Sequence, residues 1–555
     1  MAGKNYVRTQ HSTSAAATAG MSQDVMIDGA MQPYGLTLDK FLHHAARWHP
    51  EAQVVTAGPD DMLDRIGYAA LKERAQRVSV ILAGLGVGLG SRVATLAWNT
   101  RAHLEAWYAI MGMGAACHTL NPRLTADQSG AMLRQSGAGI LIVSADLLPL
   151  AEQIAGNAPA LTRILVIDGS SGDEPPVRDG LTIAALQPDA GSAGTPMAWG
   201  AFDETMPSGL CFTSGTTGAP KGVTYTHRSG YLHTLRMLQA DMLGITAADT
   251  VLAAVPMFHA NAWGLPFATP AVGAKLVLPG RRTDGAALAK LIACEGVTVA
   301  VGVPTVWLGL LEHLEANGGD TPSLQRILVG GAPLPPALME RLERRLGVAV
   351  QTSWGMTELS PSGTMAPPGD PHRKATLSGR PAIGIDLLLT DAQGRALPEQ
   401  RNVEGHLRVR GAAVIKRYLG DKEPASDADG WFGTGDLARI DDQGSLIITG
   451  RSKDLIKSGG EWINPAEIEA IVGALPEVSL AVVIGRTDPR WGERPVLLVE
   501  IRKHHTVSDD VLLRPLRERV ASWWIPDTVV RIESMPKAST GKIDRMRLKK
   551  DYGQA

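Results

Sequence analysis

The sequence predicts an α/β protein in which parallel-rich sheets are covered by helices. Short runs of Val, Ile and Leu alternate with amphipathic helical segments over most of the chain, a pattern typical of parallel strands joined by helical crossovers. The chain has 555 residues, which corresponds to roughly three to four folding units. Hydrophobic residues make up 44% of it and charged residues 20%, an ordinary composition for a globular protein.

The first predicted elements are helices. Residues 37–50 form an amphipathic pattern, with Thr37 as the candidate N-cap and Pro50 just after the helix end. A second helix is expected from Tyr68 to Leu85. The glycine-rich segment 84–90 follows a helix and has the wrong spacing for a dinucleotide-binding motif, so we interpret it as a helix C-cap and connection.

Predicted strands alternate with helices from there on. They cover residues 92–98, 139–145, 163–169, 275–280, 297–304 and 326–331. After about Arg380 the pattern changes to short strands separated by turns, at 385–391, 405–411 and 444–450, which predicts an antiparallel or barrel-like subdomain. Beyond Arg451 the order α, β, β, α, β is expected, over residues 465–475, 480–485, 495–502, 508–524 and 528–533. This last part predicts a small, mobile α+β C-terminal domain.

We expect three parts along the chain: an N-terminal tail over residues 1–30, a large N-terminal domain over 31–452 and a small C-terminal lid over 453–555. The tail is rich in Ser, Thr and Ala and has no acidic residue before Asp24. It resembles a transit peptide faintly, but no Arg-rich amphipathic face develops, so a disordered tail is the favoured interpretation. A secretory signal is excluded because no apolar segment follows the basic residues.

Composition excludes several classes of function. The chain has 54 Lys and Arg against 56 Asp and Glu, so it lacks the positive excess of a nucleic-acid-binding protein. Aromatic residues make up only 5%, which argues against base-stacking platforms. No run of about 20 apolar residues predicts a membrane span. The three cysteines are far apart and form no CxxC pair, which fits a reducing, cytoplasmic compartment without disulfides or a zinc site.

The densest chemical motif is TSGTTGAPKG at residues 213–222. Its glycines, hydroxyls and lysine are typical of a loop that surrounds phosphate groups with backbone amides and adds one positive charge. Pro220 precedes Lys221, so the loop is not a Walker A motif. The candidate ATP ligands here are Thr213, Ser214, Gly215, Thr216, Thr217, Gly218 and Lys221.

Further motifs follow in a fixed order. They are PMFHANAWG at 256–264, GGAP at 330–333, SWGMTE at 353–358, GTGD at 433–436, GRSKDLIKSGGEWI at 450–463 and PKASTGK at 536–542. Together with the phosphate loop, they resemble the adenylate-forming superfamily, which contains acyl-CoA synthetases, nonribosomal-peptide adenylation domains and firefly-type luciferases. The resemblance covers about residues 35–550, and it predicts a large domain followed by a small mobile one.

The resemblance implies ATP-binding roles for residues outside the phosphate loop. Trp354 would offer a flat face to adenine, Asp436 and Arg451 would bind the ribose, and Glu358 would ligate Mg²⁺ together with Thr213. The full set of implied ATP-binding residues beyond the loop is Gly331, Ala332, Pro333, Ser353, Trp354, Gly355, Met356, Thr357, Asp436, Arg451 and Lys542.

Lys542 is the expected catalytic residue, accompanied by Glu358 and Thr357. The reacting carboxylate and the α-phosphate are both anions, so their approach requires a positive charge at the transition state. Other lysines near the C-terminus, such as Lys537, Lys549 and Lys550, are ordinary surface lysines by comparison. Only the PKxxTGK context distinguishes Lys542 from them.

The resemblance also implies an acyl pocket, a hinge and a CoA site. The acyl pocket would include His259, Asn261, Trp263 and Gly330, although His259 could equally be a core histidine. Lys453 would be the hinge of the C-terminal domain, at a position where many relatives carry Asp. The CoA-binding residues would be Lys457, Ser458, Gly459, Gly460, Glu461 and Trp462.

The predicted activity is that of an AMP-forming acyl-CoA synthetase. A carboxylic acid and ATP would give an acyl-adenylate and pyrophosphate, and CoA would then displace AMP. The finer resemblance is to bacterial medium- and long-chain fatty-acyl-CoA synthetases, a group that also holds methylthiopropionate-CoA ligases. Loading of a separate carrier protein, a luciferase-like oxygenase and a non-enzymatic nucleotide sensor are the alternatives. Homodimers are common among similar enzymes.

Overall fold

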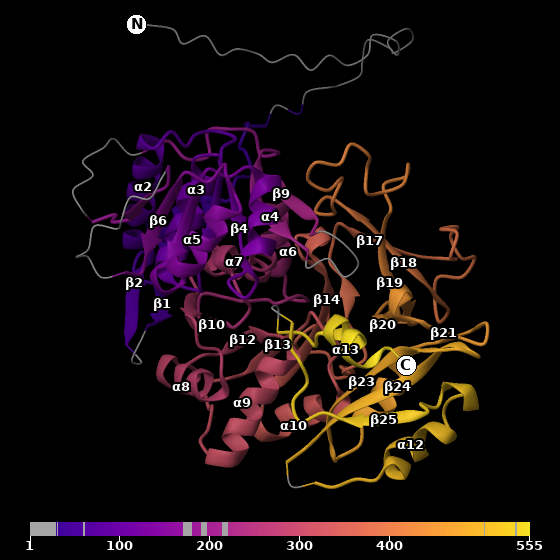
Figure 1. The fold of residues 1–555 in the computed structure, drawn as a ribbon. Coiled ribbons are helices and arrows are strands. Elements are labelled where there is room, and N and C mark those ends of the chain that lie inside the picture. The colour runs from indigo at the N-terminus through magenta and orange to yellow at the C-terminus, as the bar shows by residue number, and fades with distance from the viewer. Residues whose placement is uncertain are drawn as a thin grey trace, which may run out of the picture. The chain divides into compact units, whose positions relative to one another are not determined.

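The computed structural model describes residues 29, 31–58, 62–169, 180–189, 197–213, 220–503, 505–538 and 541–554. The chain divides into two compact units, residues 1–35 and 36–555 (Figure 1). The predicted tail over 1–30 lies outside the described residues, except for Gly29. In the described part of the larger unit, the strands form four sheets with helices between them, which confirms the predicted α/β class.

The first sheet of the larger unit has the strand order β7-β6-β5-β3-β4-β8-β9 and is parallel except for the pair β8–β9. Its strands are β3 (Arg92–Leu96), β4 (Ala116–Thr119), β5 (Ile140–Ser144), β6 (Arg163–Ile167), β7 (Thr182–Ala185), β8 (Pro207–Phe212) and β9 (Gly222–Thr226). The helices in this stretch of chain are α2 (Tyr68–Gly84), α3 (Arg101–Gly112), α4 (Ala126–Ser136), α5 (Leu148–Gly156) and α6 (His227–Met237).

The second sheet has the order β16-β15-β14-β13-β12-β10-β11-β1-β2. Its strands are β1 (Gln53–Ala57), β2 (Leu63–Gly67), β10 (Thr250–Ala253), β11 (Lys275–Leu278), β12 (Val299–Gly302), β13 (Arg326–Val329), β14 (Ala349–Gly355), β15 (Ser362–Met365) and β16 (Arg380–Pro381). The associated helices are α1 (Asp39–Trp48), α7 (Leu265–Val272), α8 (Gly285–Glu295), α9 (Pro304–Asn317) and α10 (Pro336–Leu346). Because β10, β12, β13 and β14 are parallel neighbours, their carboxyl ends meet at one edge.

The third sheet confirms the predicted antiparallel subdomain. It consists of β17 (Ile385–Thr390), β18 (Glu404–Gly411), β19 (Phe432–Ile440) and β20 (Leu446–Arg451), each pair antiparallel. The sequence analysis did not identify β19, which carries the GTGD motif. Glycines at 433 and 435 and an aspartate at 436 weaken its strand pattern, because these residues are depleted in strands.

The fourth sheet contains β21 (Ile456–Ser458), β22 (Glu461–Ile463), β23 (Val478–Asp488), β24 (Gly492–Ile501) and β25 (Thr528–Arg531). With helices α11 (Pro465–Gly473) and α12 (Asp509–Arg517), it reproduces the predicted order α, β, β, α, β. The hairpin β21–β22 and the last helix α13 (Arg545–Tyr552) were not predicted.

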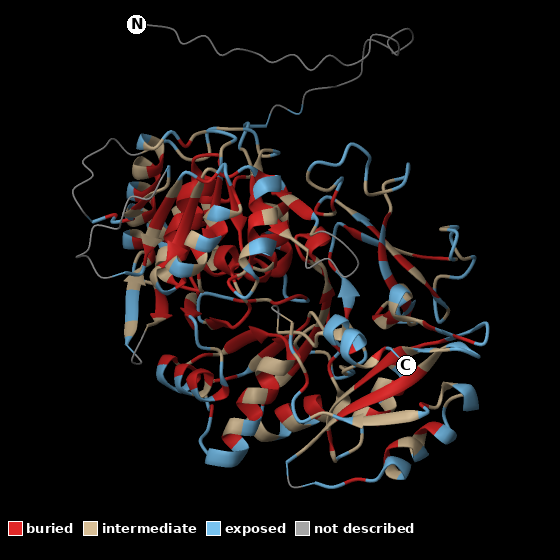
Figure 2. Ribbon diagram, in the orientation of Figure 1, coloured by how far each residue is buried: buried red, intermediate tan, exposed pale blue. Residues whose placement is uncertain are grey.

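Burial explains why the central strands were easy to recognise. Figure 2 shows buried residues along the strands and exposed residues on outer helix surfaces such as that of α12. Every residue of β12 is buried, and a parallel strand covered on both faces appears in sequence as a continuous apolar run.

No helix of the described residues is long and apolar enough to span a bilayer.

One local prediction was wrong. Helix α1 begins at Asp39, and the residue before it, Leu38, has helical backbone angles and makes no side-chain cap. The Thr37 hydroxyl instead accepts a hydrogen bond from the Lys40 amine at 2.9 Å. The Thr37 hydroxyl thus binds a side-chain amine rather than a backbone amide of the first helical turn.

Candidate active site

The predicted ATP-binding residues come from strand ends that the fold brings together. Gly330 and Gly331 follow β13, Ser353 to Gly355 end β14, and Thr213 follows β8. In α/β proteins, ligands bind in the crevice outside the carboxyl ends of parallel strands. The parallel pairing of β13 and β14 brings residues 330–331 and 353–355 to one edge of the second sheet, whereas Thr213 follows β8 of the first sheet.

The phosphate loop is closed at its base by backbone pairing. Ser214, Gly215, Thr216, Thr217 and Gly218 lie outside the described residues. At the loop ends, the Thr213 amide donates to the Lys221 carbonyl at 2.9 Å. Phe212 and Gly222 are partners in the antiparallel pair β8–β9. The two strands therefore fix both ends of the loop.

Glu358 is held by a tyrosine that the sequence analysis missed. The Tyr418 hydroxyl donates to Oε1 of Glu358 at 2.9 Å, and the Lys221 amine lies 4.7 Å from the centre of the Tyr418 ring. Burial and the Glu358 carboxylate raise the pKa of Tyr418, so its hydroxyl stays a donor at neutral pH. Tyr418 thus connects the phosphate-loop lysine to the predicted metal ligand. No motif surrounds Tyr418, so sequence gave no signal for it.

The donor set around Glu358 fits a metal ion that arrives with a nucleotide. The described residues contain no group of three His, Cys, Asp or Glu side chains able to hold a metal. Among the same residues, no hydrogen bond engages the second carboxylate oxygen of Glu358. Mg²⁺ is usually bound by one or two carboxylates together with substrate phosphates and water. One buried carboxylate beside a phosphate loop suits that arrangement.

Asp436 is the most completely partnered carboxylate of the site. It is 1% exposed, and it lies opposite Arg451 in the antiparallel pair β19–β20. Arg451 Nε lies 2.8 Å from one carboxylate oxygen, and the Trp354 indole donates to the other at 2.9 Å. Burial raises the pKa of Asp436, while the Arg451 charge and the Trp354 hydrogen bond oppose that shift. Asp436 is therefore fixed in orientation.

Trp354 has a structural role in addition to the predicted one. It is 7% exposed and belongs to a hydrophobic cluster with Tyr225 and Leu359. A Cβ atom on Gly363 would lie 2.6 Å from the indole, so the ring is packed directly against backbone. Adenine stacking on Trp354 stays a prediction.

The structure places Lys542 beside Gly331, one of the predicted ATP-binding residues. A Cβ atom on Gly331 would lie 3.3 Å from Cε of Lys542, and the Thr305 hydroxyl donates to the Gly541 carbonyl at 2.8 Å. Burial and the nearby Arg451 charge lower the pKa of Lys542 to about 8, although Asp436 opposes the shift. The C-terminal loop is therefore docked on the first turn of α9.

The acyl block contains an unusual backbone turn. Ala260, Asn261, Ala262 and Trp263 have φ values of 44°, 53°, 46° and 53°, although non-glycine residues in this region cost roughly 1–2 kcal/mol each. The turn places the Trp263 indole over the glycine pair, since a Cβ atom on Gly330 would lie 3.1 Å from Cη2. Burial and the charge of Lys542 lower the pKa of His259 to about 3, so its imidazole is neutral.

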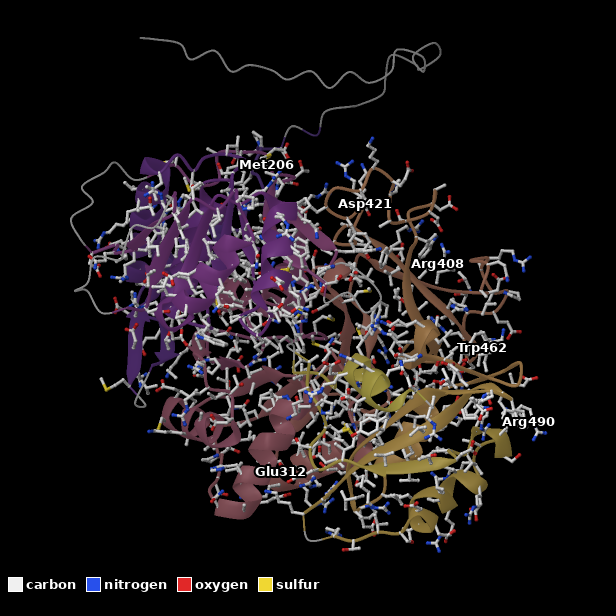
Figure 3. The ribbon with its side chains drawn as sticks, in the orientation of Figure 1. Met206, Glu312, Arg408, Asp421, Trp462 and Arg490 are labelled. Carbon is white, nitrogen blue, oxygen red and sulfur yellow. The ribbon has the colours of Figure 1, made fainter. Side chains whose placement is uncertain are left out.

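The predicted CoA-binding residues form the hairpin β21–β22. Ser458 pairs with Glu461, so the turn consists of Gly459 and Gly460, whose φ values are 61° and 92°. Two-residue hairpin turns favour glycine at such positions. Trp462 is 54% exposed, and Figure 3 shows it on the outside of the molecule.

The structure shows no polar contact between the hairpin and three predicted ATP-binding residues within the described part of the chain. Among the described residues, no hydrogen bond or ion pair joins the hairpin to Asp436, Glu358 or Lys542. The predicted hinge residue Lys453 lies between them, in the short helical turn Ser452–Asp454 that follows β20.

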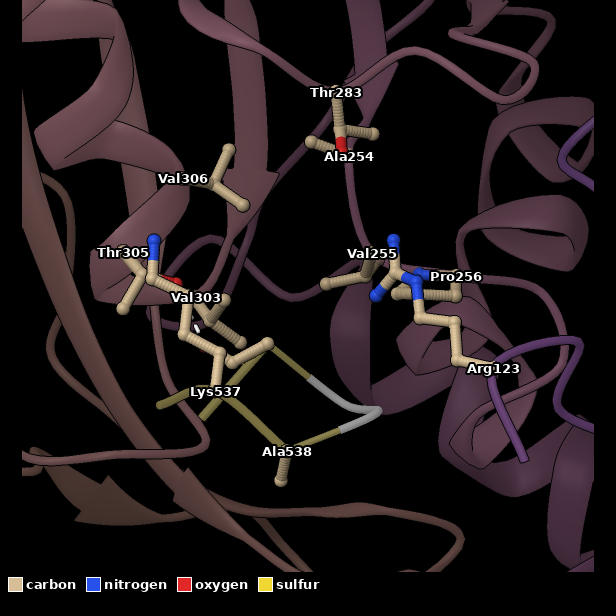
Figure 4. Close-up of a pocket in the computed structure, with 11 residues that line it drawn as sticks. Arg123, Ala254, Val255, Pro256, Thr283, Val303, Thr305, Val306, Lys537 and Ala538 are labelled. Carbon is tan, nitrogen blue, oxygen red and sulfur yellow. Dashed lines mark hydrogen bonds between the residues drawn. The ribbon is translucent and has the colours of Figure 1, made fainter. Parts of the chain in front are cut away.

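A cavity of about 420 Å³ adjoins the Lys542 loop. Figure 4 shows Arg123 and Lys537 extending into it from opposite sides. Val255 and Val303 contribute to its wall, and Gly541 closes one side. Thr305 belongs to no motif that the sequence analysis singled out, because it acts through tertiary position alone.

Comparisons with known proteins agree with the motifs. A family model described as AMP-binding enzyme matches residues 42–419, and one described as AMP-binding enzyme C-terminal domain matches residues 467–542. A medium-chain-fatty-acid–CoA ligase of Ectopseudomonas oleovorans is 39% identical over 95% of this chain and 97% of its own length. A 3-methylmercaptopropionyl-CoA ligase of Ruegeria lacuscaerulensis is 38% identical over 95% of this chain and 99% of its own.

A solved structure has the same fold. The anthranilate CoA ligase AuaEII in complex with anthranoyl-AMP superposes with a TM-score of 0.82 at 25% identity. The match covers 94% of this chain and 98% of that one. The large N-terminal and small C-terminal domains are therefore those of adenylate-forming enzymes.

Proposed function

Because this chain belongs to the AMP-binding enzyme family and is an AMP-forming acyl-CoA synthetase, we propose that its acid substrate is a medium- or long-chain fatty acid. The support is that the relative of Ectopseudomonas oleovorans is a medium-chain-fatty-acid–CoA ligase, and the match covers nearly the full length of both proteins. The second candidate is a short sulfur-containing acid of the methylthiopropionate type. It is favoured by the near-equal similarity to the ligase of Ruegeria lacuscaerulensis.

We assign the first half-reaction, formation of the acyl-adenylate, to the residues around Asp436, Glu358 and the phosphate loop. Asp436 and Arg451 hold the ribose, and the loop 213–221 holds the phosphates. Glu358 and Thr213 would hold Mg²⁺, which would neutralise phosphate charge. The acid carboxylate attacks the α-phosphorus of ATP, the bond from that phosphorus to the bridging oxygen breaks, and pyrophosphate leaves with the electron pair.

Lys542 stabilises the charge that develops during this attack. Its side chain lies with Cε against Gly331, and the Thr305–Gly541 hydrogen bond positions the loop that carries it. A preorganised cation at a partly buried site is worth more than one in water, because it needs no reorganisation when the charge appears. The docking of this loop is the observation that best supports an arrangement ready for adenylate formation.

The second half-reaction requires the hairpin to approach the same site. The CoA thiol attacks the carbonyl carbon of the acyl-adenylate, loses its proton to solvent, and AMP departs with the electrons of its bond to carbon. We assign Lys453 as the hinge between domains 31–452 and 453–555, and the residues 457–462 as the CoA-binding segment. Backbone change at one exposed residue is sufficient for such a domain rotation.

We further propose a cytoplasmic location and a homodimer. ATP and CoA are supplied in the cytoplasm, and the three cysteines are free thiols in the structure, as expected in a reducing compartment. Light scattering of the purified chain measures the oligomeric state directly.

A panel of acids tests the proposed function. Carboxylic acids from propionate to palmitate are assayed for CoA-dependent AMP release, and the largest kcat/KM is expected at medium or long chain length. A maximum at methylthiopropionate would replace the first candidate by the second. ATP–pyrophosphate exchange that proceeds without any acyl-CoA product would instead indicate transfer to a carrier protein. Failure of every acid to support either reaction would contradict acid activation.

A further inference from the structure

Arg236 is a buried cation that has no partner among the residues that the structure describes. It is 6% exposed, and its Nε and Nη2 atoms are buried and make no hydrogen bond with the described residues. Burial lowers its pKa to about 10, so the guanidinium remains charged at neutral pH. An arginine without a counter-ion is costly inside a protein, because its charge is removed from water with nothing in exchange.

Arg236 belongs to the face of α6 that borders the acyl block. Ser229, His233 and Arg236 are spaced i, i+4 and i+7, which places them on one side of the helix. The Ser229 hydroxyl lies 3.4 Å from the Ser360 hydroxyl. His233 Nε2 accepts a hydrogen bond from the Ser362 amide at 3.3 Å.

The same face touches the end of the left-handed turn. A Cβ atom on Gly264 would lie 2.8 Å from the His233 ring, and Gly264 directly follows Trp263. Burial and the Arg236 charge lower the pKa of His233 to about 3. The His233 imidazole is therefore neutral. An imidazole carries no negative charge in either of its protonation states, so His233 does not neutralise Arg236.

These contacts show which end of α6 lies near the predicted ATP-binding residues. Ser229 lies beside Ser360, two residues after Glu358, so this end of the face is near the ATP-binding residues. Arg236 lies two helical turns farther along, about 10 Å at 1.5 Å per residue. An acid whose reacting carboxylate is near Lys542 and whose chain follows this face therefore extends toward the Arg236 guanidinium.

We propose that Arg236 binds a second carboxylate at the far end of the acyl substrate, so that the preferred acids are medium-chain dicarboxylic acids. The inference rests on the proposed function and narrows its substrate class. The rise of about 10 Å along α6 from Ser229 to Arg236 sets a minimum length for the aliphatic chain, and a terminal carboxylate supplies the charge that Arg236 lacks. A planar guanidinium pairs with a carboxylate through two parallel hydrogen bonds.

The test compares acids that differ only in the distal group. Octanoate and octanedioate, and decanoate and decanedioate, are assayed with the full-length enzyme by CoA-dependent AMP release. The variants are Arg236→Met, which keeps the volume and removes the charge, and Arg236→Lys, which keeps the charge. Arg228→Met is the matched control, because Arg228 is an exposed arginine of the same helix that pairs with Glu204 at 3.6 Å.

The wild-type enzyme is expected to have a higher kcat/KM for each dicarboxylate than for its monocarboxylate. Arg236→Met is expected to lower this ratio by at least about tenfold, mainly through KM. The substitution removes the guanidinium that would bind the distal carboxylate, and that carboxylate would then be buried without a partner. Arg236→Lys should recover part of the ratio, and Arg228→Met should leave it unchanged. Equal use of both acids by wild type and Arg236→Met overturns the proposal.

Thermal unfolding separates this role from a purely structural one. Octanedioate without ATP should raise the Tm of wild type and not that of Arg236→Met, and ligand-free Arg236→Met should unfold at a higher temperature than wild type. A lower Tm of Arg236→Met with equal losses for both acids means that Arg236 supports the fold, and this result also overturns the proposal. If no acid is activated but octanedioate still raises the wild-type Tm, the proposed function fails and the Arg236 site stands.

Discussion

The nucleotide side and the acyl side of the active site differ in how their polar groups are satisfied. On the nucleotide side, Asp436 has Arg451 and Trp354 as partners, and Glu358 accepts from Tyr418. On the acyl side, the backbone is held in a left-handed turn and Arg236 has no partner among the described residues. The first side is organised before substrate binds, whereas the second leaves a charge for the substrate to satisfy.

This difference predicts which substitutions affect which substrate. Changes on the nucleotide side should alter the KM for ATP or the rate of adenylate formation with every acid. Changes on the acyl side should alter the KM for the acid and leave ATP binding nearly intact. The predictions below test this separation.

Replacement of Lys542 should have the largest effect. Loss of one preorganised charge at the transition state costs about 10²–10³ in rate, so Lys542→Ala should slow ATP–pyrophosphate exchange by about that factor with every acid. Lys549→Ala is the control, since Lys549 is an exposed lysine that pairs with Glu493. Exchange by Lys542→Ala within about twofold of wild type would exclude the catalytic role.

Replacement of Asp436 should affect ATP specifically. Asp436→Asn keeps the shape of the side chain but removes the charge paired with Arg451, and hydrogen bonds to charged groups contribute about 1.5–3 kcal/mol. The KM for ATP should therefore rise about 10- to 100-fold. With 2′-deoxy-ATP, which lacks one ribose hydroxyl, the same substitution should cost less. An equal loss with both nucleotides would show that Asp436 does not bind the ribose hydroxyls.

The pH dependence should identify the protonation state of Lys542. Its pKa in the free protein is about 8, and the charged form is the active one. The rate is therefore full below pH 8 and falls above it, by about tenfold per pH unit in kcat/KM for ATP, which reports the free enzyme. Lys542→Arg should remove the decline, because arginine stays protonated throughout this range. A decline that persists in Lys542→Arg belongs to another group.

On the acyl side, Gly330→Ala should affect the acid more than ATP. The added Cβ would lie 3.1 Å from the Trp263 ring of the predicted acyl pocket and 2.4 Å from the Ser353 hydroxyl of the predicted ATP site, and overpacking of this kind costs about 1–3 kcal/mol. The KM for the acid should rise about tenfold and the KM for ATP by less, because the Ser353 hydroxyl can rotate away whereas the packed indole cannot. Gly309→Ala is the control, because its added Cβ meets no atom within 4 Å. A rise in the KM for ATP alone would break the separation between the two sides.

The smallest effect is expected at Thr305. Thr305→Val removes the hydroxyl that donates to the Gly541 carbonyl, and a typical net hydrogen bond of 0.5–1.5 kcal/mol corresponds to about a two- to tenfold slower adenylate formation. Thioester formation from supplied acyl-adenylate should not change. Thr162→Val removes a comparable hydroxyl–carbonyl bond to Gly139 far from these residues in the fold and serves as the control. Equal slowing of both half-reactions would show that Thr305 does not act by docking the lysine loop.

The sequence predicted the nucleotide side far better than the acyl side. Strands such as β12 and β13 were identified because burial on both faces requires continuous apolar runs. Thr213, Glu358, Asp436 and Lys542 were predicted as site residues because the short motifs that contain them resemble those of the adenylate-forming superfamily. Tyr418, Thr305 and Arg236 were missed, since each belongs to an ordinary local pattern and acquires its role from what folds against it.

By itself, the sequence determined the α/β class, the antiparallel subdomain, the C-terminal α+β order and the reaction type. These features depend on local periodicity and on motifs whose chemistry is contained within about ten residues. Only the tertiary structure decided that Lys542 docks against Gly331, that Trp354 orients Asp436, and that Arg236 is buried without a partner. Such facts depend on contacts between residues far apart in the chain, and burial, which sets the cost of an unpaired charge, exists only once the chain has folded.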